Sequence, residues 1–272
     1  MVAATLHFIS PLDRYRTEKP YFLNVVADDP SQTILQTNLE YTPRHGIALS
    51  DIRERGLEAF SLENNGFAIL KYPKYQTASD LDPAEGDGAP SSAIESFCDD
   101  MVKLVMRECN AVHGICYDYR IRRNDSRDVS DYERDQDQGR TAAAPPVFPV
   151  HIDHTVEGGP KRIRRHLTEQ EAETYLNKDF RTRIINVWRP LNRPVEDCPI
   201  TLCDPRSVNA QCDLVAADRV TPDFAVELYY LKHNPNQKWY WLPRQAPDEL
   251  LVFVNYDSNC RLDGTQWGSK CF

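Results

Sequence analysis

Val150-His151-Ile152-Asp153-His154-Thr155 is the stretch that decides how this chain of 272 residues is interpreted. It follows a proline-rich break and precedes a run of short strand-like segments. Residues i and i+2 of a strand point to the same face of a sheet, so His151 and Asp153 are expected to point into the mouth of a barrel. A neutral imidazole and a carboxylate placed in this way can occupy two adjacent positions on one metal ion.

The spacing alone is weak support for a metal site. With 7 His and 41 acidic residues in 272 positions, about one His-x-acid match arises by chance. On the motif alone, the interpretation that competes with a metal site is a surface strand in which His151 and Asp153 are only hydrogen-bonded. A second His from another strand would complete a two-His-one-carboxylate triad, which leaves three positions on Fe(II) open for a bidentate cosubstrate and O₂.

The residues after this motif predict a mainly β fold. Short strand-like segments, separated by Pro- and Asp-rich turns, are typical of a sandwich or barrel. The candidate strands are residues 184–191, 199–203, 212–216, 227–233, 238–242 and 249–256. We therefore expect one domain over residues 1–272, with its β core in residues 150–272.

Residues 1–149 are expected to add N-terminal strands and helices. Residues 21–26 are expected to form a strand. Asn64-Asn65-Gly66 predicts a hairpin turn between residues 60–62 and 67–70. Residues 82–92 are expected to form a loop, and residues 122–140 a charged, solvated loop, with a lid as the alternative.

Two helices are marked by capping boxes. Ser92 with Glu95 opens the first, and Thr168 with Glu171 opens the second, which is expected to run to about Asn177. After Ser92, apolar residues recur at helical spacing, so one face of this helix is expected to be buried.

Composition excludes several classes of function. The net charge of −9 disfavours binding to nucleic acid or anionic membranes. We find no apolar run of membrane-spanning length and no signal peptide, so we expect a cytoplasmic protein. Phosphate-binding glycine loops and the G-x-S-x-G motif are missing from the sequence, and the 8 cysteines form no C-x-x-C pair. The cysteines are expected to be free, buried thiols.

The remaining polar candidates are weaker. His154 breaks the strand alternation and is expected in a supporting or surface position. His233, which ends a predicted strand, is the one candidate for a distal metal ligand, although a surface position is the simpler interpretation. Arg189 shares a strand face with Ile185 and Val187, and it is expected either to bind a carboxylate of a substrate or cosubstrate or to form an ion pair at the rim.

Several linked motifs resemble the fungal AsaB-like hydroxylase/desaturases, a group related to the gibberellin GA4 desaturase and to CmcJ. The matching segments are residues 150–155, 183–191, 199–207, 234–240, 242–249 and 252–258. The resemblance implies a double-stranded β-helix (jelly-roll) fold and a mononuclear non-haem Fe(II) site with His151 and Asp153 as ligands. It also implies 2-oxoglutarate and O₂ as cosubstrates and a small secondary metabolite as the substrate. Asn186, Arg189 and Tyr240 are the expected pocket residues.

The chain departs from this family in one respect. The family has a distal His shortly after the Asn-Tyr-Asp-Ser stretch, whereas no His follows His233 in this sequence. We expect a jelly-roll core without its last strands. The sequence could be truncated, could lack a tail, or could bind iron differently. The main hypothesis is an Fe(II)/2-oxoglutarate-dependent oxygenase that hydroxylates, desaturates or oxidatively cyclises a metabolite; the alternative is a non-catalytic jelly-roll protein that binds a small molecule or a partner.

Overall fold

The computed structural model describes residues 2–24, 35–73, 92–124, 144–222 and 224–259. Its strands are β1 (Val2–Ile9), β2 (Tyr21–Leu23), β3 (Tyr41–Asp51), β4 (Phe67–Lys71), β5 (His151–Ile152), β6 (Arg183–Trp188), β7 (Thr201–Cys203), β8 (Leu214–Val220), β9 (Ala225–Leu231), β10 (Trp239–Trp241) and β11 (Glu249–Asp257). Its α-helices are α1 (Ile52–Arg55), α2 (Leu62–Asn65), α3 (Ser92–Cys109), α5 (Gly158–Arg165), α6 (Glu169–Tyr175) and α7 (Ala210–Asp213). Short 3₁₀ turns are found at Asp13–Arg16, Leu57–Ala59 and Pro205–Ser207.

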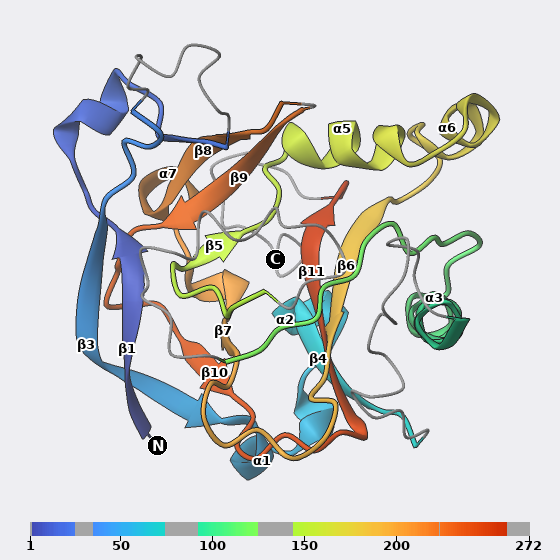
Figure 1. Ribbon diagram of the computed structural model, residues 1–272. Helices are drawn as coiled ribbons and strands as arrows, with labels where there is room; N and C mark the ends of the chain where they lie inside the picture. The colour runs from blue at the N-terminus through green and yellow to red at the C-terminus, as the bar shows by residue number, and fades with distance from the viewer. Residues whose placement is uncertain (1, 25–34, 74–91, 125–143, 223, 260–272) are drawn as a thin grey trace.

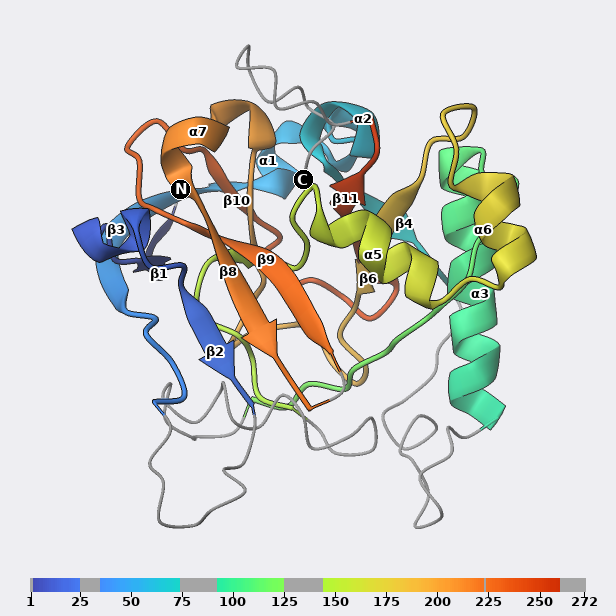
Figure 2. The ribbon, with the colours of Figure 1, turned by 90° about the horizontal axis from the view of Figure 1, so that it is seen from above.

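Three sheets curl around a common centre, with α3, α5 and α6 on the outside (Figure 1). Their strand orders are β1-β3-β10-β7, β4-β11-β6 and β2-β8-β9-β5. Strands far apart in the sequence therefore lie side by side; β4, for example, pairs with β11. The view from above shows β8 and β9 crossing over the sheet that contains β10 (Figure 2). The expectation of a mainly β fold with flanking helices is confirmed.

The six strands predicted after the metal motif are all present, with changes at their ends. Cys212 belongs to α7 and not to the strand that follows it, because the side chain of Asn209 accepts hydrogen bonds from the backbone N–H groups of Gln211 and Cys212 and so caps a helical turn. Helix α5 was not predicted, since its Gly-Gly-Pro start hides the helical pattern. Helix α6 begins with the predicted capping box of Thr168 and Glu171.

The predicted hairpin at Asn64-Asn65-Gly66 is wrong. These residues lie in and directly after α2, where the hydroxyl of Ser61 accepts a hydrogen bond from the backbone N–H of Asn64 at 3.2 Å. Gly66 ends the helix in the left-handed conformation, with φ +72°. The serine cap therefore wins over the turn preference of the Asn-Asn-Gly sequence. Residues 82–91 of the predicted loop, and 125–140 of the predicted charged segment, lie outside the described residues.

Helix α3 packs on one face of the sheet β4-β11-β6. Its buried residues Met101 and Leu104 join a hydrophobic cluster with Leu250 and Val252 of β11. Ile185 and Val187 of β6 pack against the same cluster. The side chain of Asn186 therefore points to the opposite face of β6, toward the centre of the molecule.

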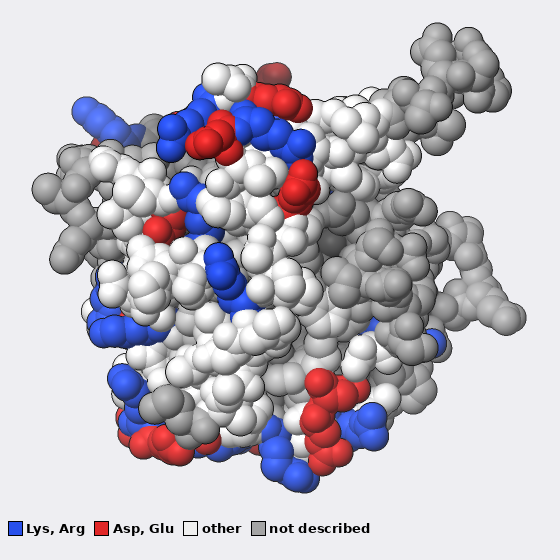
Figure 3. Space-filling view, turned by 90° about the vertical axis from the view of Figure 1, so that its left-hand side faces the viewer, with Lys and Arg blue, Asp and Glu red and all other residues white. Residues whose placement is uncertain are grey.

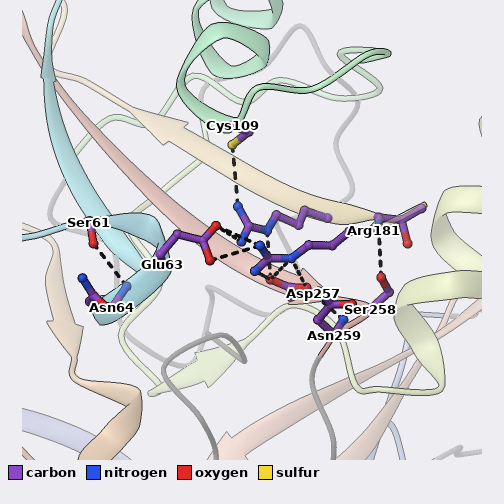
Figure 4. A network of polar contacts seen from close by, with 10 residues as sticks. Ser61, Glu63, Asn64, Cys109, Arg181, Asp257, Ser258 and Asn259 are labelled. Carbon is purple, nitrogen blue, oxygen red and sulfur yellow. Dashed lines mark hydrogen bonds and ion pairs between the residues drawn. The ribbon is translucent and has the colours of Figure 1, made fainter. Parts of the chain in front are cut away.

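A network of charged groups fixes the neighbouring ends of β6 and β11 (Figure 4). The carboxylate of Asp257 is fully buried and accepts hydrogen bonds from Nε of Arg181 at 2.9 Å and from Nε of Arg183 at 2.8 Å. Both guanidinium groups also reach Glu63 of α2. These pairs join the start of β6, the end of β11 and α2, so the two strands have a fixed relative position.

The face that carries β1 and β3 presents a broad uncharged area, with acidic and basic side chains interspersed around it (Figure 3). Among the described residues, no helix is long and apolar enough to cross a membrane. The described cysteines are thiols and not disulfide-bonded, but Cys116 and Cys212 are exposed, so the prediction that the thiols are buried is wrong at these two positions.

Candidate metal site

His151 and Asp153 meet at the end of β5. Strand β5 pairs with β9 through His151 and Tyr230, and it ends at Ile152, so Asp153 lies in the bend that follows the strand. The two side chains nevertheless converge, with Nε2 of His151 3.3 Å from Oδ1 of Asp153. They are 27% and 40% exposed because they face a large cavity of about 2100 Å³ inside the protein.

The orientation of the His151 ring suits a metal ligand. Its Nδ1 lies 2.7 Å from the carbonyl oxygen of Pro149, and a carbonyl can only accept, so Nδ1 carries the proton. In the neutral ring, the lone pair is then on Nε2, the atom that faces Asp153. A backbone carbonyl that fixes the tautomer of a histidine in this way is the usual support for an imidazole ligand. The donor atoms present fit a divalent metal such as Fe(II).

The carboxylate of Asp153 is held in its charged form. Burial raises the pKa of Asp153, but the hydrogen bond and charge of His151, with a smaller contribution from Asn186, outweigh burial and lower it. Burial lowers the pKa of His151, and the same pairing with Asp153 outweighs burial and raises it. The two groups therefore form an ion pair at the wall of the cavity.

Of the three predicted pocket residues, one reaches the His151–Asp153 pair and two lie elsewhere. Asn186 donates a hydrogen bond from Nδ2 to Oδ2 of Asp153 at 3.0 Å, so the structure brings it to the site. Arg189 points to the other side, where its guanidinium lies 5.1 Å from the ring centre of Phe97 in α3. Tyr240 is buried in an aromatic cluster with Phe60 and Phe67, at ring distances of 5.2 Å and 5.8 Å.

Among the described residues, no group of three His, Cys, Asp or Glu side chains could hold a metal ion. His233, the predicted distal candidate, contacts the ring of Phe8 at 5.2 Å and does not join the pair. His154 is buried, with Nε2 3.4 Å from the hydroxyl of Tyr117. It therefore occupies a supporting position rather than the surface. Of the predicted ligands, the described residues bring together His151 and Asp153.

Arg122 is a cavity residue that the sequence did not single out. One of its guanidinium N–H groups donates to the carbonyl oxygen of Pro145 at 2.6 Å, and its backbone pairs with Ala144. Although Arg122 is exposed at its surface, the protein atoms around its guanidinium lower its pKa by desolvation, and the charge of Asp153 opposes this effect. The guanidinium is thus held where its charge acts on both His151 and Asp153. The sequence did not distinguish Arg122 from the other charged residues of segment 122–140. The only signal in the sequence was the place of this segment before the metal motif.

The chain is similar to a known protein family and to individual known proteins. A family model described as "Oxidoreductase/YMDC permease-like domain" matches residues 6–268. The Fe(II)/2-oxoglutarate-dependent dioxygenase nvfI of Aspergillus novofumigatus is 29% identical over 92% of this chain and 82% of its own length. The hydroxylase/desaturase efuI of Hormonema carpetanum is 27% identical over 85% of this chain and 77% of its own length.

The fold is also similar to that of a solved structure. A variant of the iron and alpha-ketoglutarate-dependent endoperoxidase NvfI superposes with a TM-score of 0.75 and 26% identity, over 95% of this chain and 84% of that one. The jelly-roll expectation is thereby confirmed. The resemblance to AsaB-like proteins is confirmed as well, since the hydroxylase/desaturase asaB of Aspergillus flavus is 31% identical over 35% of this chain and 46% of its own length.

Proposed function

This chain belongs to the oxidoreductase/YMDC permease-like domain family, and we propose that His151 and Asp153 hold the iron of an Fe(II)/2-oxoglutarate-dependent oxygenase. The oxygenase class is that of its relatives and of the similar solved structure. The observation that carries the assignment of the site is the 3.3 Å approach of Nε2 of His151 to Oδ1 of Asp153 inside the cavity. Bound iron would supply the activation of O₂, with 2-oxoglutarate as the co-reductant.

The other groups of the site prepare these two ligands. The carbonyl of Pro149 keeps the proton of His151 on Nδ1, and the amide of Asn186 engages Oδ2 of Asp153. Each ligand therefore has one atom held by the protein and one atom facing its neighbour. Ligands supported in this way need little rearrangement when a metal binds.

Arg122 supplies the cation that a carboxylate ligand in this cavity would need. Its charge acts on the His151–Asp153 pair, and the planar guanidinium can bind a carboxylate through two hydrogen bonds. We assign Arg122 to a carboxylate of 2-oxoglutarate. Arg189 and Tyr240, the residues predicted from the sequence for the pocket, lie against α3 and in the aromatic core, so they give less support to this role.

The substrate is a small molecule, as it is for related oxygenases. The cavity of about 2100 Å³ has room for both a cosubstrate and a metabolite. Relatives include hydroxylase/desaturases and an endoperoxidase, and hydroxylation, desaturation and oxidative cyclisation all begin with removal of a substrate hydrogen. The geometry of the substrate above the His151–Asp153 pair would decide between these outcomes.

Anaerobic titration with Fe(II) in the presence of 2-oxoglutarate tests the site. The expected result is a weak visible charge-transfer band that saturates near one equivalent of iron. His151→Ala and Asp153→Ala should each abolish the band. His45→Ala should keep it, because His45 is exposed, is hydrogen-bonded to Thr5 and does not line the cavity. A folded wild-type protein without the band would favour the alternative, a jelly-roll protein that binds a small molecule without iron.

A further inference from the structure

Two amide side chains from neighbouring strands hold Asp153 in different ways. Asn186 of β6 donates from Nδ2 to Oδ2 of the Asp153 carboxylate at 3.0 Å. Asn255 of β11 accepts, through Oδ1, a hydrogen bond from the backbone N–H of Asp153 at 3.4 Å. One amide thus fixes the carboxylate, and the other fixes the backbone from which the carboxylate projects.

The position of Asn255 depends on an irregularity in β11. Strand β11 pairs with β6 so that Phe253 lies opposite Asn186 and Val254 lies opposite Ile185. The register then shifts, because the next paired residue is Tyr256, opposite Ile184. Asn255 is the extra residue of this β-bulge. Bulges redirect a side chain locally, and they are frequent next to active sites.

The bulge is held firmly on both sides. Two residues after Asn255, Asp257 is clamped by Arg181 and Arg183. Just before the bulge, the backbone N–H of Val254 donates to the carbonyl of Gly66 at 2.8 Å. Asn255 itself is only 5% exposed. Its side chain therefore has little freedom to leave Asp153.

The hydrogen bonds also fix which way each amide points. A backbone N–H can only donate, so the atom of Asn255 that faces it is the oxygen. A charged carboxylate can only accept, so the atom of Asn186 that faces it is the nitrogen. The two asparagines therefore use opposite ends of the same functional group.

We propose that Asn186 and Asn255 are a pair of positioning residues for Asp153. Asn186 occupies Oδ2 and leaves Oδ1, the atom beside Nε2 of His151, for the metal. Asn255 holds the bend after β5 in the conformation that brings this carboxylate to His151. The inference rests on the proposed function of the His151–Asp153 pair.

Cobalt(II) binding to the full chain, followed by its visible absorption, tests the pair. Asn186→Leu and Asn255→Leu remove the hydrogen bonds at similar volume, and each should weaken Co(II) binding about 10- to 100-fold and change the spectrum. Asn255→Asp keeps an acceptor for the Asp153 N–H and should restore wild-type affinity to within about threefold, although it carries no amide. Wild-type affinity and spectrum in both Leu variants would overturn the proposal.

Asn38→Leu is the matched control. Asn38 is as buried as Asn255, but its side chain contacts Glu18, Lys19 and Tyr21, far along the chain from Asp153. This variant should lower stability without changing the Co(II) affinity of the folded protein. A loss of Co(II) affinity equal to that of the Leu variants would show that general destabilisation explains their effect.

A second measurement needs no metal. Hydrogen exchange at the backbone amide of Asp153 should become more than about 10-fold faster in Asn255→Leu and stay near the wild-type rate in Asn255→Asp. Unchanged exchange in Asn255→Leu would overturn the role of Asn255. If wild-type protein binds no Co(II), the proposed iron site fails, whereas this exchange measurement still decides whether Asn255 holds Asp153.

Discussion

At the scale of single residues, the site consists of two side chains, each with one polar atom bonded to the protein and one polar atom that faces the other side chain. His151 and Asp153 each have one atom engaged by the protein, through Pro149 and Asn186. The two atoms that are left face one another at 3.3 Å. The spacing of these two residues could be read from the sequence, but their supports could not, because Asn186 and Asn255 come from strands that meet Asp153 only in the folded chain.

The first prediction concerns Arg122. Arg122→Met removes the guanidinium but keeps a long apolar side chain, and it should weaken 2-oxoglutarate binding to the metal-loaded protein about 10-fold or more, because a charge-assisted hydrogen bond to the carboxylate is lost. Isothermal titration calorimetry measures this effect. Arg16→Met should leave the affinity unchanged, because Arg16 is 84% exposed and does not line the cavity.

A comparison of 2-oxoglutarate with a ligand that lacks its second carboxylate makes this prediction more specific. If Arg122 binds the carboxylate of 2-oxoglutarate that lies far from the keto group, Arg122→Met should not weaken binding of 2-oxobutyrate, which lacks that carboxylate. An equal loss for both ligands would show that Arg122 does not read the distal carboxylate.

A second prediction concerns pH and Glu249. Burial raises the pKa of Glu249, but hydrogen bonds from Arg53, from the backbone of Ala246 and from Lys71 outweigh burial and lower its pKa to about 2. A lowered carboxyl pKa stabilises the fold fully above the unfolded value of 4.5, and this contribution is lost as the pH falls toward 2. Glu249→Gln should therefore cost about 2 kcal/mol at pH 7 and almost nothing near pH 2.

Urea unfolding of both proteins between pH 2 and 7 measures this difference. Glu58→Gln offers a control, because Glu58 lies exposed in the 3₁₀ turn Leu57–Ala59. A stability difference for Glu249→Gln that did not shrink with falling pH would contradict the ion-pair explanation.

At the scale of the elements, α3 and the sheet it covers determine which face of β6 carries the chemistry. Ile185 and Val187 face α3, so Asn186 must face the cavity. The sequence predicted this alternation and the helical face of α3 correctly, because both are local periodicities. It placed Arg189 on the face of Ile185 and Val187 as well, and the structure explains that position through the rings of Phe97 and Tyr72.

The third prediction belongs to α3. Leu104→Ala removes a buried side chain from the cluster between α3 and β11, and it should lower the free energy of unfolding by about 3 kcal/mol. Val112→Ala, just after the helix, should change it by less than about 0.5 kcal/mol, since Val112 is 71% exposed. Denaturant unfolding measures both. Similar values for the two variants would mean that α3 contributes little to the core.

At the scale of the whole molecule, the fold class could be predicted, but the sheet partners could not. The strands after residue 183 are predicted by local patterns of β-branched and aromatic residues. Pairings such as β4 with β11 and β3 with β10 depend on packing between distant parts of the chain. Strand β3 was missed because Pro43 and Gly46 interrupt its pattern. Helix α2 was mistaken for a turn because Asn and Gly are common both in turns and at the C-terminal ends of helices.

The clamp of Glu63, Arg181, Arg183 and Asp257 has a consequence for how the chain is made. During synthesis, β4 and Glu63 leave the ribosome long before their partners exist, which are β11 for the strand and Arg181 and Arg183 for Glu63. This part of the core therefore waits until almost the whole described chain has been translated. Contacts between such distant segments make folding slow, on the order of milliseconds to seconds. The nascent protein therefore exposes unpaired strand edges for most of its synthesis, and its yield in cells should depend on chaperones that bind such edges.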